Sequence, residues 1–345
     1  MINVGLAGIG FMGWIHTLAY QATDGITLRG FASGNPAKRR GDWTSISGNF
    51  GPPGERIDVS QMSVHDSLDG LLSDPAIDLI DICLPPHLHA DAIGRSIAAG
   101  KHVLCEKPLA LTAEQSRELA DLSTPNSMLL VAHILPMMAE YRYLVDAADD
   151  GRFGKLRSMR LKRFISPPHW IDDFYDPATV GGPLIDLHVH DAHLIELLLG
   201  TPDTVHTAGD TIDGEYRRYE TLMTYADGRY ASSGGGVIDS PARGFTHGYE
   251  AIFDDATVQF EFAAYHDTKS NDDCTASIPL TVLHNNGHLE HPETGEPETG
   301  DPDPVAAFIR QAAAVAAAIT TGQIPPALSP HTAAAAIALC QRQSP

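Results

Sequence analysis

The chain has few cysteines and few basic residues, and it lacks a long uninterrupted apolar segment. Its four cysteines, among 345 residues, show no CxxC spacing, which is typical of proteins that stay in a reducing compartment. The N-terminus carries no basic leader, and the longest late apolar run, Ala312–Ile319, is too short to span a bilayer. We therefore expect a cytoplasmic protein.

Positive charge is scarce: 23 lysines and arginines stand against 44 aspartates and glutamates, a formal net charge of −21 at pH 7. Such a chain repels polyanions, so we expect neither nucleic acid nor a membrane surface as a partner. A small-molecule substrate fits better. The length allows two domains, each with its own core.

Strand-like and helix-like segments alternate through the first part of the chain. This alternation is typical of a parallel sheet with helices on its faces, so we predict an α/β domain over residues 1–132. Between its strands lies a polar insertion, Arg39–Gln61. The predicted strands are Ile2–Ala7, Ile26–Ala32, Ile77–Leu84, His102–Cys105 and Met128–Ala132, and the predicted helices include Phe11–Thr23 and Leu88–Ala99.

The pattern changes after Ala132, where several strand-like segments follow one another without long helices between them. This indicates an α+β domain with a mostly antiparallel open sheet over residues 133–345. The acidic, proline-rich stretch Pro292–Pro304 reads as an exposed loop. The predicted helices are Glu140–Asp150, Ile185–Leu199, Val305–Thr321 and Thr332–Gln341; the predicted strands are Leu156–Phe164, Val205–Thr211, Tyr219–Tyr225, Arg229–Ser233, Tyr249–Phe253 and Val258–Phe262.

A glycine-rich turn, GIGFMG, joins the first strand to the first helix. In this context GxGxxG is the dinucleotide fingerprint: the glycines permit a tight turn, close approach of a pyrophosphate and close helix–strand packing. The helix N-terminus then offers unpaired N–H groups to an anion. We expect this turn to bind a nicotinamide dinucleotide through Gly8, Gly10, Phe11, Met12 and Gly13; the alternative is a purely structural turn.

The second strand ends without the acidic residue that usually holds the ribose hydroxyls of NAD. Ser33 stands near that position, and Lys38 follows with two arginines. A hydroxyl with nearby cations accepts a 2′-phosphate, which an acid would repel. We therefore expect Ser33 and Lys38 to contact NADP in preference to NAD, although these cations could also simply solvate a helix face.

A third cluster lies in GGPLIDLHVHDAHLIELLLG, residues 181–200. Asp186, His190 and His193 are spaced i, i+4 and i+7, which places them on one face of a helix. Burying such groups on an otherwise apolar helix costs several kcal/mol unless partners or function compensate. The spacing favours a catalytic face, with a capped helix carrying polar core residues as the alternative.

Together, GIGFMG, DICLPPHLHADAI, CEKPL and GGPLIDLHVHD resemble the glucose–fructose oxidoreductase, inositol dehydrogenase and MocA (GFO/IDH/MocA) family, in the family's order and separations. The resemblance implies an N-terminal Rossmann domain and an α+β domain for substrate binding and oligomerisation. It also implies an NAD(P)-dependent dehydrogenase of sugars, cyclitols or related polyols, as a homo-oligomer (dimer or tetramer). A non-catalytic nucleotide- and sugar-binding regulator is the alternative.

By this resemblance, Lys107 lies where the nicotinamide meets the substrate, with Glu106 beside the cofactor. Asp186 and His190 complete the catalytic set, His190 as the base whose ordinary pKa suits proton transfer. The resemblance further assigns cofactor contacts to the turn residues Leu84, Pro85 and His89.

The chain departs from the family pattern where His193 replaces a frequent aspartate and where the His133–Pro136 stretch lacks a frequent arginine. His133, His169, Trp170 and Tyr175 are candidates for the substrate pocket. A metal hydrolase built on His87, His89 and the histidines of the third cluster is a weaker reading, and we expect no metal in the site.

Overall fold

The computed structural model describes residues 1–167, 180–212, 214–267, 269–270, 272–294 and 304–344. Its described residues form two compact units. Unit 1 comprises Met1–Met137 and Asp301–Ala334, and unit 2 comprises Met138–Gly300 and Ala335–Pro345. The chain thus returns to the first unit near its end, which the single predicted boundary at residues 132–133 does not foresee.

Unit 1 contains a six-stranded, all-parallel sheet in the order β3-β2-β1-β4-β5-β6. This is the strand order of the dinucleotide-binding fold, whose switch point lies between β1 and β4. The predicted α/β class is confirmed. The strands are β1 (Ile2–Ala7), β2 (Ile26–Ala32), β3 (Ser63–His65), β4 (Leu79–Ile82), β5 (His102–Glu106) and β6 (Leu129–Ala132).

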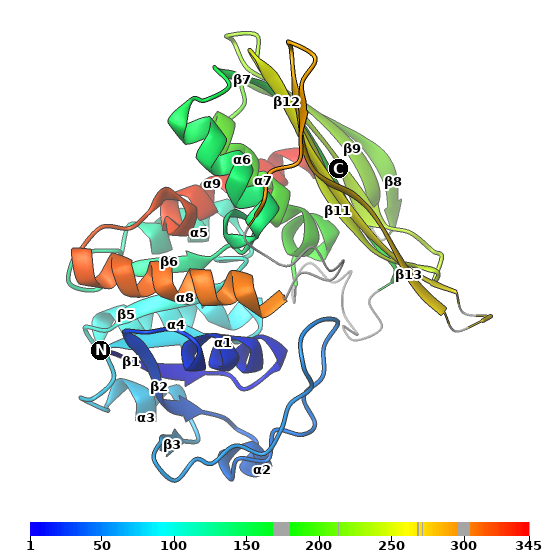
Figure 1. The fold of residues 1–345 in the computed structure, drawn as a ribbon. Coiled ribbons are helices and arrows are strands. Elements are labelled where there is room, and N and C mark those ends of the chain that lie inside the picture. Colours follow the sequence, from blue (N-terminus) through cyan, green and yellow to red (C-terminus); the bar gives the residue numbers. More distant parts are fainter. Residues whose placement is uncertain (168–179, 213, 268, 271, 295–303, 345) are drawn as a thin grey trace. The chain divides into compact units, whose positions relative to one another are not determined.

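Helices cover this sheet, as Figure 1 shows for the blue and cyan part of the chain. Because both faces are covered, the central strands are continuously buried: all four residues of β4 and of β6 lie in the core. The helices of unit 1 are α1 (Phe11–Gln21), α2 (Pro36–Arg39), α3 (Leu68–Leu72), α4 (His89–Ala98), α5 (Ala113–Ala120) and α8 (Pro304–Thr321), with 3₁₀ turns η1 (Pro86–Leu88), η2 (Leu135–Met137) and η4 (Pro326–Leu328).

The insertion Arg39–Gln61 packs onto α1. Trp43 is fully buried, and the indole N–H of Trp14 donates to the carbonyl of Pro52 at 2.9 Å. The Phe50 ring lies 4.7 Å from that of Phe11, at the glycine-rich turn. The insertion is therefore anchored by buried aromatic rings against the N-terminal half of the nucleotide fold.

Unit 2 contains an eight-stranded sheet in the order β14-β13-β12-β11-β7-β10-β9-β8. Only the pairing of β7 with β10 is parallel, so the predicted mostly antiparallel sheet is confirmed. The strands are β7 (Leu156–Ile165), β8 (Thr204–Ile212), β9 (Glu215–Thr224), β10 (Tyr230–Val237), β11 (Arg243–Phe253), β12 (Ala256–Asp267), β13 (Asp272–His284) and β14 (Leu289–Glu290).

One face of this sheet carries α6 (Ala139–Asp150) and α7 (Val189–Leu199), while the other face is open (Figure 1). Strand β7 shows why: its burial alternates, with Leu161, Arg163 and Ile165 turned inward and Arg160 exposed. Helix α9 (Pro330–Gln343) is divided between the two units.

Two local predictions need correction. The predicted helix at Ile185–Leu199 begins with a π-helical turn, η3 (Leu184–His188), and becomes α-helical only at Val189. Strands β3, β13 and β14 are not among the predicted elements. The predicted loop Pro292–Pro304 lies largely outside the described residues.

In the part of the chain that is described, no helix is long and apolar enough to cross a membrane.

Candidate active site

The glycine-rich turn has the shape that a pyrophosphate site requires. A Cβ on Gly8 would lie 2.5 Å from the carbonyl oxygen of Cys83, and one on Gly13 would lie 2.3 Å from that of Gly8. Gly10 has no heavy atom within 4 Å of such a Cβ. The outer glycines are thus needed for backbone packing, whereas Gly10 borders open space at the N-cap of α1. These residues fit a bound dinucleotide.

Lys38 reaches this turn from α2, the short helix that follows β2. Its ammonium group donates to the carbonyl of Ile9 at 2.5 Å, and partial burial lowers the pKa of Lys38. The Ser33 hydroxyl accepts a hydrogen bond from the N–H of Asn35 at 3.2 Å, and Arg39 donates to the Ser33 carbonyl at 2.7 Å. A hydroxyl and two cations therefore gather at the carboxyl end of β2, beside the glycine-rich turn.

The turn after β4 is connected to the turn after β5 by His89. This side chain is fully buried; its Nδ1 lies 2.8 Å from the carbonyl oxygen of Pro108 and its Nε2 lies 2.8 Å from that of Leu84. Both ring nitrogens face backbone carbonyls, so neither is left for a ligand. His89 is placed to fix the two turns that carry Leu84, Pro85 and Lys107. Its contact with the cofactor stays a prediction.

Glu106 and Lys107 stand at the carboxyl end of β5. The N–H of Lys107 donates to Oε2 of Glu106 at 3.1 Å. The other carboxylate oxygen, Oε1, lies 3.0 Å from Nε2 of His16 in an ion-pair contact. Glu106 is 7% exposed and Lys107 is half-buried. The backbone at Lys107 is thus held by a carboxylate that is itself held by a histidine of α1.

His16 is part of a buried polar cluster beneath the glycine-rich turn. Its Nδ1 lies 2.8 Å from Oδ2 of Asp81, which also accepts a 2.8 Å hydrogen bond from the Tyr20 hydroxyl. Burial alone would lower the pKa of His16, but the carboxylate of Asp81, assisted by Cys83, raises it well above its usual value. We therefore treat His16 as an imidazolium between two carboxylates.

In unit 2, the π-helical turn carries Asp186, and His190 follows in the first turn of α7. Both side chains are partly exposed, whereas His193 is fully buried. Burial lowers the pKa of His193 to about 3, so it is a neutral core residue at physiological pH. Asp186 and His190 thus share partial exposure, which His193 lacks. Single π-turns of this kind often occur at functional sites.

A buried ion pair involves Asp191, the residue that follows His190. Asp191 accepts two hydrogen bonds from Nε of Arg163, at 3.1 and 3.2 Å, and a third from its Nη2 at 2.8 Å. The two side chains are 1% and 3% exposed. Burial raises the pKa of Asp191, but the guanidinium outweighs it and the pKa is lowered overall. This pair ties the first turn of α7 to β7 and so fixes the backbone that presents His190.

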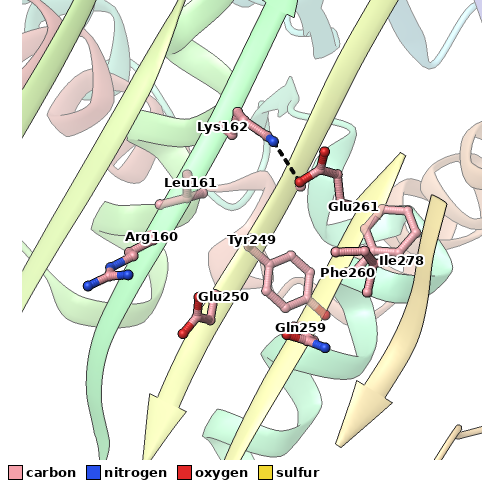
Figure 2. A pocket seen from close by; sticks show the side chains of 10 residues that line it. Arg160, Leu161, Lys162, Tyr249, Glu250, Gln259, Phe260, Glu261 and Ile278 are labelled. Carbon is pink, nitrogen blue, oxygen red and sulfur yellow. Dashed lines mark ion pairs between the residues drawn. The ribbon is translucent and has the colours of Figure 1, made fainter. Parts of the chain in front are cut away.

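A hollow on unit 2 lies elsewhere. It lies on the open sheet face across β7, β11, β12 and β13, and no predicted site residue lines it (Figure 2). Gly248 pairs with Lys162 on one side and Glu261 on the other, and their side chains meet across it at 2.6 Å. The hollow arises because Gly248 has no side chain, and it is separate from Asp186 and His190.

Of the predicted pocket residues, His133 is buried in unit 1. His169, Trp170 and Tyr175 lie outside the described residues.

With the geometry established, comparison with known proteins decides the family. Residues 2–133 match the model described as "Oxidoreductase family, NAD-binding Rossmann fold", and residues 141–265 match the GFO/IDH/MocA C-terminal domain. The chain belongs to the GFO/IDH/MocA oxidoreductase family. This confirms the resemblance that the four motifs indicate, and with it the pairing of a nucleotide-binding unit with an open-sheet unit.

Relatives within the family differ in substrate. The chain is 35% identical to 1,5-anhydro-D-fructose reductase of Ensifer adhaerens over 39% of this chain and 41% of that protein. It is 29% identical to inositol 2-dehydrogenase of Rhizobium meliloti over 72% of this chain and 71% of the other. The first three curated relatives are matched over 41%, 54% and 53% of their lengths, about half.

Among solved structures, levoglucosan dehydrogenase in complex with NADH superimposes with a TM-score of 0.75 at 21% identity, covering 99% of this chain and 95% of that one. At this identity the likeness shows a common fold.

Four residues of the two clusters are absent from the sequence-based candidates: His16, Asp81, Arg163 and Asp191. Asp81 interrupts an otherwise apolar strand, and Arg163 falls on the inward face of β7. A charged residue at a core position was the available signal, since burial of an unpaired charge is costly. The partner of such a residue is not evident from the sequence, however, because His16 and Asp81 lie 65 residues apart.

Proposed function

We propose that the protein is an NAD(P)-dependent oxidoreductase that transfers a hydride between a nicotinamide cofactor and the hydroxyl or carbonyl carbon of a sugar, cyclitol or related polyol. The observation that carries this proposal is the open space at Gly10, at the N-terminus of α1, in a strand–turn–helix with the dinucleotide fingerprint. The names of the relatives, a reductase of an anhydro sugar and an inositol dehydrogenase, support the substrate class.

The cofactor would be held at its pyrophosphate by the backbone of Gly8–Gly13 and at its ribose by Ser33 and Lys38. When bound, a nicotinamide ring supplies the acceptor or donor of the hydride. We propose NADP over NAD because the described residues at the end of β2 offer a hydroxyl and cations.

The side chains supply acid–base and electrostatic chemistry. His190 takes the proton of the substrate hydroxyl as general base, which typically contributes 10²–10⁴-fold. Lys107 donates to the reacting oxygen and stabilises developing alkoxide charge. Asp186 binds a neighbouring hydroxyl or orients the imidazole. His16, Glu106 and Asp191 act as positioning residues through the contacts described above.

We further propose a cytoplasmic homo-oligomer. All four cysteines are unpaired, which suits a reducing compartment. The open face of the unit 2 sheet exposes Leu222 and Ile278, apolar side chains that association between subunits would cover.

The test is a screen of sugars and cyclitols with NADP⁺ and NAD⁺, read at the absorbance of the reduced ring. We expect cofactor reduction with at least one polyol, and faster reduction with NADP⁺. Binding of cofactor and sugar without turnover across the panel would instead favour a regulator. Failure to bind either cofactor would contradict the proposal.

A further inference from the structure

The hairpin formed by β13 and β14 gathers three side chains with the chemistry of a metal site. Val282 pairs with Glu290, and the N–H of His284 donates to the carbonyl of His288 at 2.9 Å. Since alternate residues of a strand share a face, His284, His288 and Glu290 project from the same side of the hairpin. Their ligand atoms lie within 4.8 Å of one another.

The hairpin's scaffold is rigid. Gly287, at a φ of +87°, closes the turn, and its N–H donates to the carbonyl of His284 at 2.9 Å. Asn285 ties this turn to the neighbouring hairpin, because its side-chain amide donates to the carbonyl of Asp254 at 2.8 Å. The imidazole of His284 also packs edge-on against Phe153, with ring centroids 5.6 Å apart. The backbone of this turn and the ring of His284 are therefore held in place.

The separations suit a tetrahedral ion. Zinc bonds of about 2.0–2.2 Å to nitrogen and oxygen place neighbouring ligand atoms about 3.4 Å apart. His284 Nε2 and Glu290 Oε2 are already 3.1 Å apart. His288 is exposed, so its ring can move the remaining ångström or so by a side-chain rotation.

We propose that His284, His288 and Glu290 bind one divalent transition-metal ion, Zn²⁺ or a similar borderline ion, with a fourth position open to water. Two imidazoles and a carboxylate are the ligand set that such ions accept. The net charge of −21 raises the local concentration of cations around the protein. The ion would fasten the two-residue edge strand β14 to β13, a structural role outside the proposed reaction.

A second group of three such residues in the described part of the chain, His16, Asp81 and Cys83, does not share these properties. Its His16 and Asp81 side chains are buried, whereas the hairpin group is open to solvent, and burial raises the pKa of the Cys83 thiol to about 12. A thiol that stays protonated is a poor metal ligand. The hairpin is therefore the cluster that can open to an ion.

The test is a calorimetric titration of the full chain with Zn²⁺ at pH 7.5, together with thermal unfolding with and without the ion. The variants are His288→Ala, in the exposed turn, and Glu290→Gln. The matched control is His266→Ala, which removes an exposed histidine that lies 2.7 Å from the carboxylate of Asp273. Among the described residues, His266 belongs to neither group of three metal-ligating side chains.

We expect the wild type and His266→Ala to bind one equivalent of Zn²⁺ and to gain thermal stability from it, as a ligand of the folded state must give. Both hairpin variants should weaken this binding at least tenfold while keeping the wild-type unfolding temperature without zinc. Equal zinc binding by the wild type and both hairpin variants, or no zinc binding by the wild type, would overturn the proposal and leave His284 and Glu290 as an ordinary ion pair.

Discussion

The imidazole of His16 lies between two carboxylates from adjacent strands, 2.8 Å from Asp81 of β4 and 3.0 Å from Glu106 of β5. Glu106 in turn accepts the N–H of Lys107. Three elements of the nucleotide fold, α1, β4 and β5, are thereby joined at the residue that precedes the proposed catalytic lysine. A buried charge network is used here to hold a backbone segment in place.

We predict that His16→Ala lowers the free energy of unfolding by about 3–5 kcal/mol, because it leaves two buried carboxylates without their cation. A double-mutant cycle with Glu106→Gln should give a coupling of about 0.5–3 kcal/mol. The control cycle uses His266 and Asp273, an exposed pair whose coupling should be much smaller. Equal coupling in the two cycles would refute the positioning role of His16.

The buried His193 should make the protein sensitive to acid. Its folded-state pKa of about 3 is below the ordinary value of 6.5, so below pH 6.5 the unfolded chain takes up a proton that the folded chain refuses. Stability is therefore complete above pH 6.5 and is lost progressively toward pH 3, by about 2 kcal/mol at pH 5 for this residue alone. Denaturant unfolding at pH 5 and pH 8 should show a smaller difference for His193→Leu than for the wild type. The difference between the two proteins at pH 8 gives the effect of the substitution on packing alone. If His193→Leu loses as much stability between pH 8 and pH 5 as the wild type does, His193 is not the residue that takes up the proton.

The pair Arg163–Asp191 should support both stability and His190. Removing the negative charge with Asp191→Asn leaves a buried guanidinium unpaired, so we expect a loss of about 3–5 kcal/mol in unfolding free energy. The exposed pair Arg218–Asp210 is the control, and Asp210→Asn should change stability little. At a temperature low enough for Asp191→Asn to stay folded, its kcat should fall by a larger factor than its KM rises. A stability loss with unchanged kcat would limit Asp191 to a structural role.

The cofactor preference should reside at the end of β2. Ser33→Asp places a carboxylate where a 2′-phosphate would lie, and we expect the ratio of kcat/KM for NADP⁺ over NAD⁺ to fall at least tenfold. Lys38→Ala should lower the same ratio by a smaller factor. Arg56→Ala, an exposed arginine of the insertion, serves as the control and should leave the ratio unchanged. A wild-type enzyme that prefers NAD⁺ would show that Ser33 and Lys38 do not select for a 2′-phosphate on the ribose.

Local patterns were sufficient to predict much of the fold. Strands β1 and β2 have the predicted bounds, since continuous apolar runs between turn residues define buried parallel strands. Strand β13 was missed because its sequence, DDCTASIPLTVLH, contains a proline and no regular alternation; its pairing with β12 supplies the order. Tertiary pairing of this kind leaves no local trace.

The candidate site divides in the same way. The roles of Gly8, Gly10 and Gly13 are predictable from the sequence, because each glycine meets a backbone requirement of the dinucleotide-binding turn. The π-helical turn Leu184–His188 is not predictable, since the spacing of its residues resembles that of an α-helix. The contacts of His16 with Asp81 and of Arg163 with Asp191 join residues far apart in sequence, so only the fold reveals them.

The most direct test of the proposed reaction compares Lys107→Ala and His190→Ala with the wild type. Cofactor binding is followed by the fluorescence of the reduced nicotinamide, and turnover by its absorbance with the best polyol of the screen. We predict that each variant binds the cofactor within threefold of the wild type while kcat/KM falls at least 10²-fold, and that imidazole-dependent recovery is seen only with His190→Ala. Turnover at the wild-type rate in either variant would contradict the assignment of hydride-transfer chemistry to these two residues.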